Sequence, residues 1–354
     1  MKNEHLLIIR FSTLSDTAML VPVVASLARS YPDLRVTVLS SAISRPLFEG
    51  LAPNVGFMYV ENSGEYNSLP GLNALYRRLK AKHFTAVADM QNSVRSRYLR
   101  TRFKVDRTLV AHLDLHRAGK RRLVAKTHKR LVQQPTIFQN YAAVLSRLRY
   151  PIKWDFDSIF QGTKGNLRLL PEAWMREKKP FQKWIGIAPS ALFPCLTYPI
   201  EKMEEVVDSL SRKHSNAKIF LMGTGVRERQ VFSRLSAHIP RCVIMAELVK
   251  DLAEELILIS HMDVVVSMDS TYAHLASSVG TPVVSIWGAT HPYLGYMGWQ
   301  QQEENAVQLS LPCRPCSIRG NKACFRHDRM CLQGITPDMI VEKVEKVIEN
   351  QNNN

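Results

Sequence analysis

Short apolar runs alternate with helical patterns along the first half of the chain. The predicted strands are residues 6–11, 35–40, 55–60 and 86–89, and the predicted helices are 17–30, 73–82 and 136–148. Such alternation indicates a parallel sheet that is covered by helices on both faces. The first half is therefore predicted to be a doubly wound α/β domain spanning residues 1–160.

A second alternation follows a break in this pattern. Residues 150–183 combine prolines, glycines and many charges, and they predict an interdomain connection whose centre is the linker 161–182. Beyond it the predicted strands are 183–188, 218–222, 242–245, 264–268 and 283–287, and the predicted helices are 199–214, 228–236, 252–260 and 271–279. We expect a second domain over 183–335, an amphipathic terminal helix over 336–349, a disordered tail over 350–354, and a ligand cleft between the two halves.

Length and composition fit this organisation. The chain has 354 residues, a natural length for two domains, and its hydrophobic content of 45% suffices for two cores. No apolar run approaches the length of a membrane span, and the N-terminus lacks a signal-peptide pattern. These features predict a soluble cytoplasmic protein.

The net charge of +16 favours an anionic partner, and it is unevenly spread. Residues 95–130 hold thirteen Lys and Arg against two acids. This stretch is either a solvated face or a surface for nucleic acid, phosphorylated lipid or an acidic membrane. The chain lacks a basic surface interleaved with aromatic residues and a recognition helix, so we expect no nucleic-acid partner.

The most informative segment is residues 268–276, where a buried strand opens into a helix. A helix N-terminus offers unpaired N–H groups and the positive end of a dipole, which suit a diphosphate. Ser270 and Thr271 add hydroxyl groups, and His274 lies on the same helical face. The alternative is that Asp269 only caps the helix and that His274 is a buried structural residue.

Two other strand ends carry candidate chemistry. Gly223 and Gly225 follow one strand, with Glu228 opening the next helix, which suits a ribose contact but is also common in ordinary turns. The first strand leads to Asp16, which is either a helix cap or a general base. No G-x-G-x-x-G motif follows that strand, which argues against a dinucleotide-dependent oxidoreductase.

Four cysteines gather near the C-terminus: Cys313, Cys316, Cys324 and Cys331. Four thiolates in a short span suit structural zinc, although their spacing departs from the common paired form. In a reducing cytosol we expect no disulfides.

Taken together, these segments resemble a known enzyme family over nearly the whole chain. Residues 8–22, 89–95, 269–276 and 280–287 and the Cys-rich C-terminus are similar, in the same order, to the ADP-heptose:lipopolysaccharide heptosyltransferases of glycosyltransferase family 9. The resemblance implies a GT-B fold of two Rossmann-like domains. It also implies an inverting transfer of heptose from ADP-heptose to the lipid-linked inner core, without a cofactor or catalytic metal. Family members carry similar cysteines.

The resemblance also assigns roles to residues. Asp16 matches the proposed base, and Ser270, Thr271 and His274 match the site of the donor diphosphate. The remaining donor candidates are Ser190, Gly223, Gly225, Glu228, Asp269 and Gly288. The acceptor is expected on the first domain, through a phosphorylated lipid-linked oligosaccharide at the acidic inner membrane. The acceptor candidates are Arg10, Ser12, Thr13, Arg95, Arg97, Lys120, Arg121 and Arg122.

Two departures from the family pattern affect this assignment. Ser15 stands where the family has a glycine before the aspartate, and Leu196 stands where it has a lysine that neutralises the leaving diphosphate. Loss of that cation weakens stabilisation of the developing charge. The sequence therefore leaves two hypotheses: an active heptosyltransferase, or an impaired or altered-donor relative that binds nucleotide sugar or acidic lipid.

Overall fold

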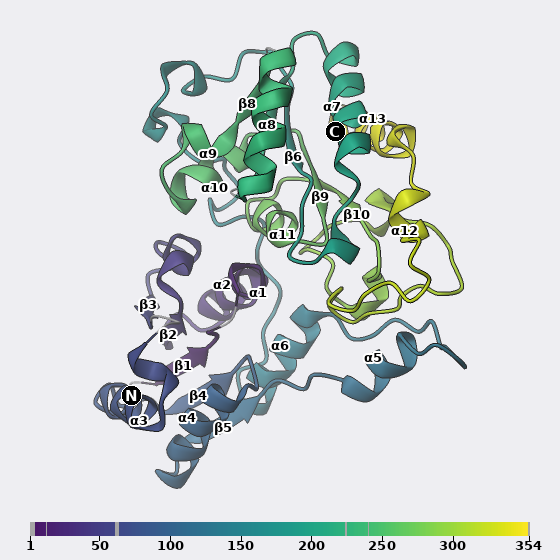
Figure 1. Ribbon diagram of the computed structural model, residues 1–354. Helices are drawn as coiled ribbons and strands as arrows, with labels where there is room; N and C mark the ends of the chain where they lie inside the picture. Colours follow the sequence, from purple (N-terminus) through teal and green to yellow (C-terminus); the bar gives the residue numbers. More distant parts are fainter. Residues whose placement is uncertain (1–3, 12, 61–63, 224, 240, 353–354) are drawn as a thin grey trace. The chain divides into compact units, whose positions relative to one another are not determined.

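The computed structural model describes residues 4–11, 13–60, 64–223, 225–239 and 241–352 (Figure 1). The chain divides into two compact units. Unit 1 comprises residues 1–116 and 135–162, and unit 2 comprises residues 117–134 and 163–354. Each unit is built on one fully parallel sheet.

Unit 1 contains a five-stranded sheet in the order β3-β2-β1-β4-β5. The strands are β1 (His5–Ile9), β2 (Arg35–Ser40), β3 (Val55–Tyr59), β4 (Ala86–Asp89) and β5 (Leu109–His112). The α-helices are α1 (Leu14–Ala18), α2 (Val21–Ser30), α3 (Leu69–Lys80), α4 (Val94–Val105) and α6 (Ile137–Arg147). Helices α3 and α4 pack together, as do α2 and α6, and the core includes Leu7, Ile9, Leu75 and Phe103.

Unit 2 contains a six-stranded sheet in the order β11-β10-β9-β6-β7-β8. The strands are β6 (Trp184–Ala188), β7 (Lys218–Leu221), β8 (Cys242–Ile244), β9 (Val264–Met268), β10 (Val283–Ile286) and β11 (Ala306–Val307). The α-helices are α5 (Arg117–Leu123), α7 (Ile200–Lys213), α8 (Val226–His238), α9 (Met245–Leu248), α10 (Leu252–Ser260), α11 (Thr271–Ser278), α12 (Met330–Gln333) and α13 (Pro337–Asn352).

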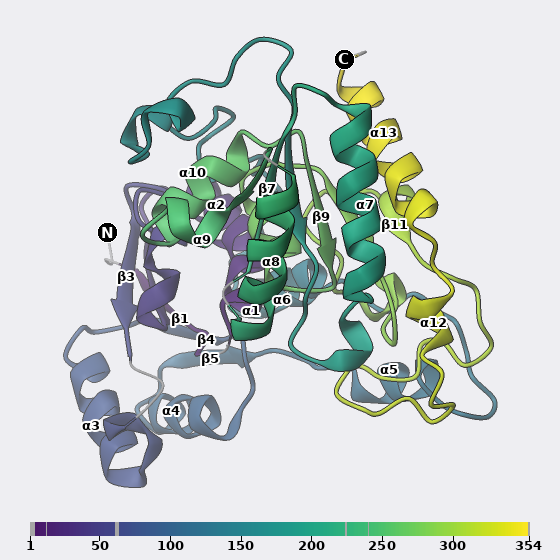
Figure 2. The same cartoon turned by 45° about the horizontal axis from the view of Figure 1, so that its top comes forward.

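Apolar helix faces cover the sheet of unit 2. Helices α7 and α13 lie side by side (Figure 2), and their buried side chains join the strands in one large core. Helices α10 and α11 pack against each other. Short 3-10 helices complete the chain: Ala42–Leu47, Glu65–Asn67, Leu167–Leu169, Ala173–Met175, Pro194–Leu196, Pro292–Leu294 and Glu303–Asn305.

Both sheets have the Rossmann strand order, which determines where a ligand is expected. In unit 1 the order reverses between β1 and β4, and in unit 2 it reverses between β6 and β9. Ligands of open parallel sheets bind outside the carboxyl ends of the strands at such a reversal. Residues that follow β1, β4, β6 and β9 therefore form the candidate site of each unit.

The predicted alternation is confirmed, although the predicted helix 17–30 is split into α1 and α2, and α9, β11 and α12 were not expected. The basic stretch of residues 95–130 contains most of α4 and all of β5 and α5. These elements were not predicted, because their many charged residues interrupt the apolar pattern. Residues 117–134 cluster with unit 2, although they lie within the stretch predicted for the first domain. Helix α13 continues to Asn352, beyond the predicted end at residue 349.

Candidate active site

The turn between β9 and α11 gathers the strongest candidates of unit 2. Met268 ends a fully buried strand, Asp269 and Ser270 follow, and Thr271 begins the helix. The Ser270 hydroxyl lies 3.0 Å from the Ser267 hydroxyl. Within the described part of the chain, the Ser270 side chain makes no hydrogen bond to cap its own helix. The first N–H groups of α11 are therefore available to an external acceptor.

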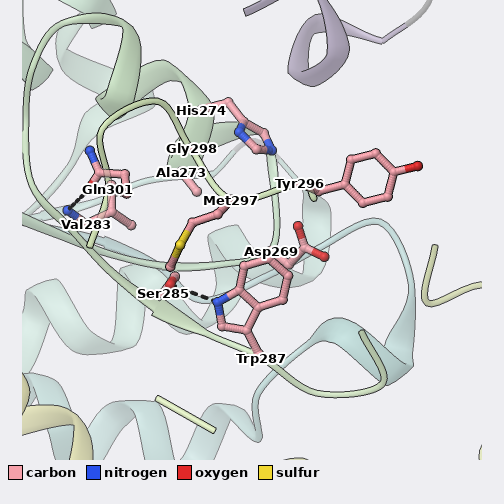
Figure 3. Close-up of a pocket in the computed structure, with 10 residues that line it drawn as sticks. All are labelled: Asp269, Ala273, His274, Val283, Ser285, Trp287, Tyr296, Met297, Gly298 and Gln301. Atoms are coloured by element: carbon pink, nitrogen blue, oxygen red, sulfur yellow. Dashed lines mark hydrogen bonds between the residues drawn. The ribbon is translucent and has the colours of Figure 1, made fainter. Parts of the chain in front are cut away.

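His274 lies one helical turn further along α11 and is 5% exposed. Its ring borders a small pocket, and Figure 3 shows the side chains of Asp269, His274 and Tyr296 at one edge of it. The cavity measures about 10 Å³, room for about one water molecule. The cavity is therefore too small to hold a nucleotide.

Asp269 is held by a residue that the sequence analysis missed. The Thr290 hydroxyl donates a hydrogen bond of 2.8 Å to its Oδ2 atom. Burial raises the pKa of Asp269 to about 6, and the Thr290 bond opposes that shift. Asp269 is half-buried in the structure, and its carboxyl group loses its proton near pH 6 rather than near pH 4.

Arg314 supports the same loop from behind. Its guanidinium is 4% exposed and donates to the carbonyl oxygens of Gly288 (2.6 Å) and Thr290 (2.9 Å). The predicted donor residue Gly288 is closely packed, because an added Cβ atom would lie 2.7 Å from the Cys195 carbonyl oxygen. Arg314 therefore fixes the loop that orients Thr290 toward Asp269. Its role has no signal in the local sequence.

The loop after β7 brings Glu228 against two glycines. Its Oε2 atom accepts a hydrogen bond of 2.7 Å from the Gly225 N–H, so it caps the start of α8. A Cβ atom on Gly223 would lie 2.6 Å from this oxygen, which explains the glycine. Charges on Glu228 and Glu255 add to burial in raising the pKa of Tyr272. Burial, with the charge of Asp251, raises the pKa of Glu255 to about 7.

Leu196 is a packing residue in the loop after β6. This loop begins near the half-buried Ser190 and is closed by Thr197, whose hydroxyl bonds to Ala191. Leu196 is 6% exposed and packs with Ala289. A Cβ atom on Gly320 would overlap the Leu196 side chain, at 2.2 Å from its Cγ atom. The position therefore holds an apolar contact with the Cys-rich segment.

In unit 1, Asp16 lies in the turn after β1 and is held on several sides. Its carboxylate pairs with Arg10 at 2.7 Å, and the Thr13 hydroxyl caps α1 by accepting from the Asp16 N–H at 3.4 Å. Arg10 is 5% exposed and also donates to the Met90 carbonyl oxygen. Arg10 and Thr13 thus position Asp16, and the acceptor contact expected of them stays a prediction. Ser12 lies outside the described residues.

The turn after β4 lies in the same unit and is built around buried Asp89. Its carboxylate accepts from two backbone N–H groups, at 2.8 Å and 3.1 Å, and from Arg100 at 2.9 Å. Arg95 stacks over the Phe11 ring at 5.6 Å, and Arg97 is exposed. Arg95 and Phe11 therefore place one cationic side chain close to the β1 turn.

The other basic candidates belong to unit 2. Lys120 is 4% exposed, and its ammonium donates to the Tyr296 hydroxyl at 2.7 Å and lies 4.1 Å from the centre of that ring. Because Tyr296 lines the pocket beside Asp269 and His274, Lys120 contacts the predicted donor side. Arg121 and Arg122 are exposed on the same helix. The expected place of these three residues on the first domain thus differs from the structure.

Comparison with known proteins agrees with this geometry. Residues 72–324 match the family model described as glycosyltransferase family 9 (heptosyltransferase), which covers well over half of the chain. The chain belongs to glycosyltransferase family 9. It is a glycosyltransferase of the heptosyltransferase type, as the sequence resemblance predicts.

Similar family-9 proteins act in lipopolysaccharide assembly. The chain is 23% identical over 304 residues to the lipopolysaccharide core heptosyltransferase OpsX of Haemophilus influenzae, covering 82% of this chain and 80% of OpsX. It is also 23% identical over 310 residues to lipopolysaccharide heptosyltransferase 3 of Escherichia coli, covering 83% and 85%.

Solved family-9 structures have the same fold. Escherichia coli heptosyltransferase WaaC with ADP aligns at a TM-score of 0.68 and 17% identity, covering 97% of this chain and 99% of WaaC. Escherichia coli ADP-heptose lipopolysaccharide heptosyltransferase II aligns at 0.69 and 18%, covering 98% and 99%. The predicted GT-B fold of two Rossmann-like domains is therefore confirmed.

The Cys-rich segment of this family-9 chain does not gather a metal-binding group. Among the described residues, no three His, Cys, Asp or Glu side chains are arranged to hold a metal ion. Burial raises the pKa of Cys316 and of Cys331, the latter to about 11. Structural zinc at these cysteines stays a prediction. No described helix is long and apolar enough to cross a bilayer.

Proposed function

We propose that this family-9 glycosyltransferase moves a heptose from ADP-heptose to the inner core of lipopolysaccharide, with inversion at the anomeric carbon and without a metal ion. The observation that carries the proposal is the open N-terminus of α11, where Ser270 leaves the first N–H groups for an anion beside Asp269 and His274. WaaC has been solved with ADP and with an ADP-heptose analogue, which supports an ADP-sugar donor here.

The proposed reaction is a single displacement. An acceptor hydroxyl attacks the anomeric carbon of the heptose, its proton passes to an Asp16 carboxylate oxygen, and the bond from that carbon to the diphosphate oxygen breaks. Arg10 keeps the Asp16 carboxylate in one orientation through their 2.7 Å ion pair. ADP leaves with the bonding electrons, so negative charge grows at its terminal phosphate.

Two features of unit 2 are suited to that charge. The N-terminus of α11 supplies N–H donors and the positive end of the helix dipole. Lys120 supplies a buried cation that reaches the pocket edge through Tyr296. We infer that these two features take the place of the lysine that Leu196 replaces.

The acceptor is proposed to be a phosphorylated, lipid-linked oligosaccharide presented at the acidic cytoplasmic face of the inner membrane. Support comes from the net charge of +16 and from Arg95 near the Asp16 turn. Lipopolysaccharide heptosyltransferases among the relatives also support this acceptor class.

The test is the reaction of the whole chain with ADP-heptose and a deacylated inner-core acceptor in excess chelator. We expect ADP release that requires the acceptor, and a product whose anomeric proton shows inverted configuration by NMR. Incubation without acceptor is the control, because it reports hydrolysis alone. Release that stops in chelator would contradict the metal-independent mechanism.

A second candidate is a relative that binds nucleotide sugar or acidic lipid without turnover, and the burial of Leu196 favours it. Calorimetry on the same preparation separates the two. ADP binding without ADP release, from ADP-heptose or from other nucleotide sugars, would support the second candidate. Absence of both binding and release would contradict the transferase and the nucleotide-sugar binder, and would leave acidic lipid, tested by binding to anionic vesicles.

A further inference from the structure

Unit 2 contains a further cluster of lysine side chains, in segments that are distant along the chain from the turn before α11. Residues 117–134 and the Cys-rich segment 313–331 are brought together by side-chain contacts over long sequence distances. The Lys129 ammonium donates to the carbonyl oxygens of Cys313 (2.8 Å) and Pro315 (2.7 Å). Figures 1 and 2 both place α5 beside the yellow segment near α12.

These two segments line an open surface pocket of about 230 Å³, in which Lys126 and Lys322 are exposed and Lys129 is half-buried. Its lining residues are Val124, Ala125, Lys126, Lys129, Cys313, Cys316, Lys322, Ala323 and Phe325. Three of them are lysines, and none of these described lining residues is acidic. In the same measure, the pocket beside α11 has about 10 Å³, so this one has room for several water molecules, enough for a phosphoryl group and part of an attached sugar.

The arrangement of the lysines points to an anion. Lys129 uses two of its three ammonium donors on backbone carbonyls, so in the described contacts one N–H is left for another acceptor. Lys126 lies 5.3 Å from the centre of the Phe325 ring, which is 47% exposed. This cation–π contact holds one ammonium at an aromatic wall, on which the carbon skeleton of a ligand can pack.

Electrostatics favours the same occupant. Like charges around one cavity repel each other, whereas a multivalent anion between them attracts each lysine. Phosphate oxygens are also strong acceptors for lysine donors.

We propose that this pocket, which we call the lysine pocket, binds a phosphoryl group through Lys126, Lys129 and Lys322, with Phe325 as its apolar wall. The site is separate from the donor cradle at Asp269, Ser270 and His274, since the two pockets share no lining residue. The phosphoryl group comes either from inorganic phosphate or from a phosphorylated sugar of the acceptor.

The test is titration of the whole chain with inorganic phosphate in saturating ADP, which blocks the donor cradle. We expect one phosphate per chain, and binding at least about tenfold weaker in the double variant Lys126→Gln/Lys322→Gln. The matched control is Lys250→Gln/Lys346→Gln, which removes two exposed lysines of the same unit. We expect that control to bind within about twofold of wild type.

Lys129→Gln is measured separately, because the two hydrogen bonds from Lys129 to backbone carbonyl oxygens also stabilise the fold. The melting temperature of this variant is recorded together with its phosphate affinity. Absence of phosphate binding in saturating ADP would overturn the proposal. Equal weakening in the double variant and its control would also overturn it, because the effect would then come from net charge alone.

A second arm identifies the source of the phosphoryl group. A phosphorylated glucosamine disaccharide and its dephosphorylated form compete against bound inorganic phosphate. Displacement by the phosphorylated form alone, lost in Lys126→Gln/Lys322→Gln, assigns the pocket to the acceptor. Phosphate binding that neither sugar displaces assigns it to free phosphate. ADP affinity, measured on the same variants in a separate titration without phosphate, tests the proposed function independently.

Discussion

Two turns in this protein follow buried parallel strands and lead into short helices, yet they differ in whether a side chain caps the helix that follows. The turn after β1 is satisfied internally: Thr13 caps α1, and Arg10 pairs with Asp16 at 2.7 Å. In the turn after β9, the Ser270 hydroxyl lies beside Ser267, and no side-chain cap is formed by Ser270 in the described structure. The first turn presents a fixed carboxylate, and the second presents helix N–H groups that the Ser270 side chain does not cap.

This difference suggests a division of labour. A carboxylate that takes a proton must be held at one position, and an ion pair with a neighbouring buried arginine achieves this. A site for a diphosphate needs donors that no internal oxygen already occupies. We therefore expect the β1 turn to govern the chemical step and the β9 turn to govern donor affinity. Kinetics and binding measured on the same variants separate these effects.

The largest expected effect is on the β1 turn. Asp16→Asn keeps the shape of the side chain but removes the base, so we expect kcat to fall about 1,000-fold. The affinity for ADP should stay within about twofold, because Asp16 is assigned to the acceptor hydroxyl rather than to the donor. Steady-state ADP release and calorimetry give the two numbers.

Asp33→Asn is the matched control for this variant, since Asp33 is exposed in the same unit. It should leave both kcat and ADP affinity near wild type. A fall in ADP affinity as large as the fall in kcat would remove the division between the two turns.

The second expected effect is at the β9 turn, where ADP affinity rather than the chemical step should be weakened. Ser270→Asp supplies a carboxylate that caps α11 and competes with the diphosphate for the same N–H groups. We expect ADP to bind about 30-fold more weakly, while the free energy of unfolding changes by less than about 1 kcal/mol. Calorimetry and chemical denaturation measure these quantities.

Ser68→Asp is the control for Ser270→Asp. Ser68 already caps α3 by accepting from the Gly71 N–H at 3.2 Å, so the same substitution there changes a closed cap. It should leave ADP affinity unchanged. Ser270→Asp with wild-type ADP affinity would show that the N-terminus of α11 does not hold the diphosphate.

The two turns also differ in how far sequence alone describes them. Both were located correctly because buried parallel strands are continuous apolar runs, and the polar residues after them stand out. The closure of each turn depends on contacts that the sequence does not display. Thr290 lies 21 residues from Asp269, and Arg314 lies 26 residues from Gly288.

The basic stretch shows the same limit at larger scale. Strand β5 is a short edge strand with exposed positions, so it lacks the apolar run that marked the central strands. Residues 117–134 cluster with unit 2 through contacts such as that of Lys129 with Cys313, 184 residues apart. From the sequence, Leu196 indicates only that the lysine of the family is missing. Its packing against Gly320 becomes visible only in the fold.

The smallest expected effect concerns the pH dependence at the β9 turn. The pKa of Asp269 is raised to about 6 in the folded protein, from 3.8 in the unfolded chain. The folded state therefore holds this proton more tightly, and its contribution to stability falls as pH rises from about 4 to about 6. Above that window the ionised carboxylate destabilises the fold.

Asp269→Asn removes this cost and keeps an oxygen for the Thr290 hydroxyl. We expect it to raise the free energy of unfolding by about 1–2 kcal/mol at pH 8, and by almost nothing at pH 4. Denaturation of variant and wild type at both pH values gives the difference, in which the similar titration of Glu255 cancels. An equal effect at pH 4 and pH 8 would show that it comes from packing rather than charge. Stabilisation at pH 8 alone would show that wild type keeps a destabilising carboxylate beside the open turn, as a role in the donor site predicts.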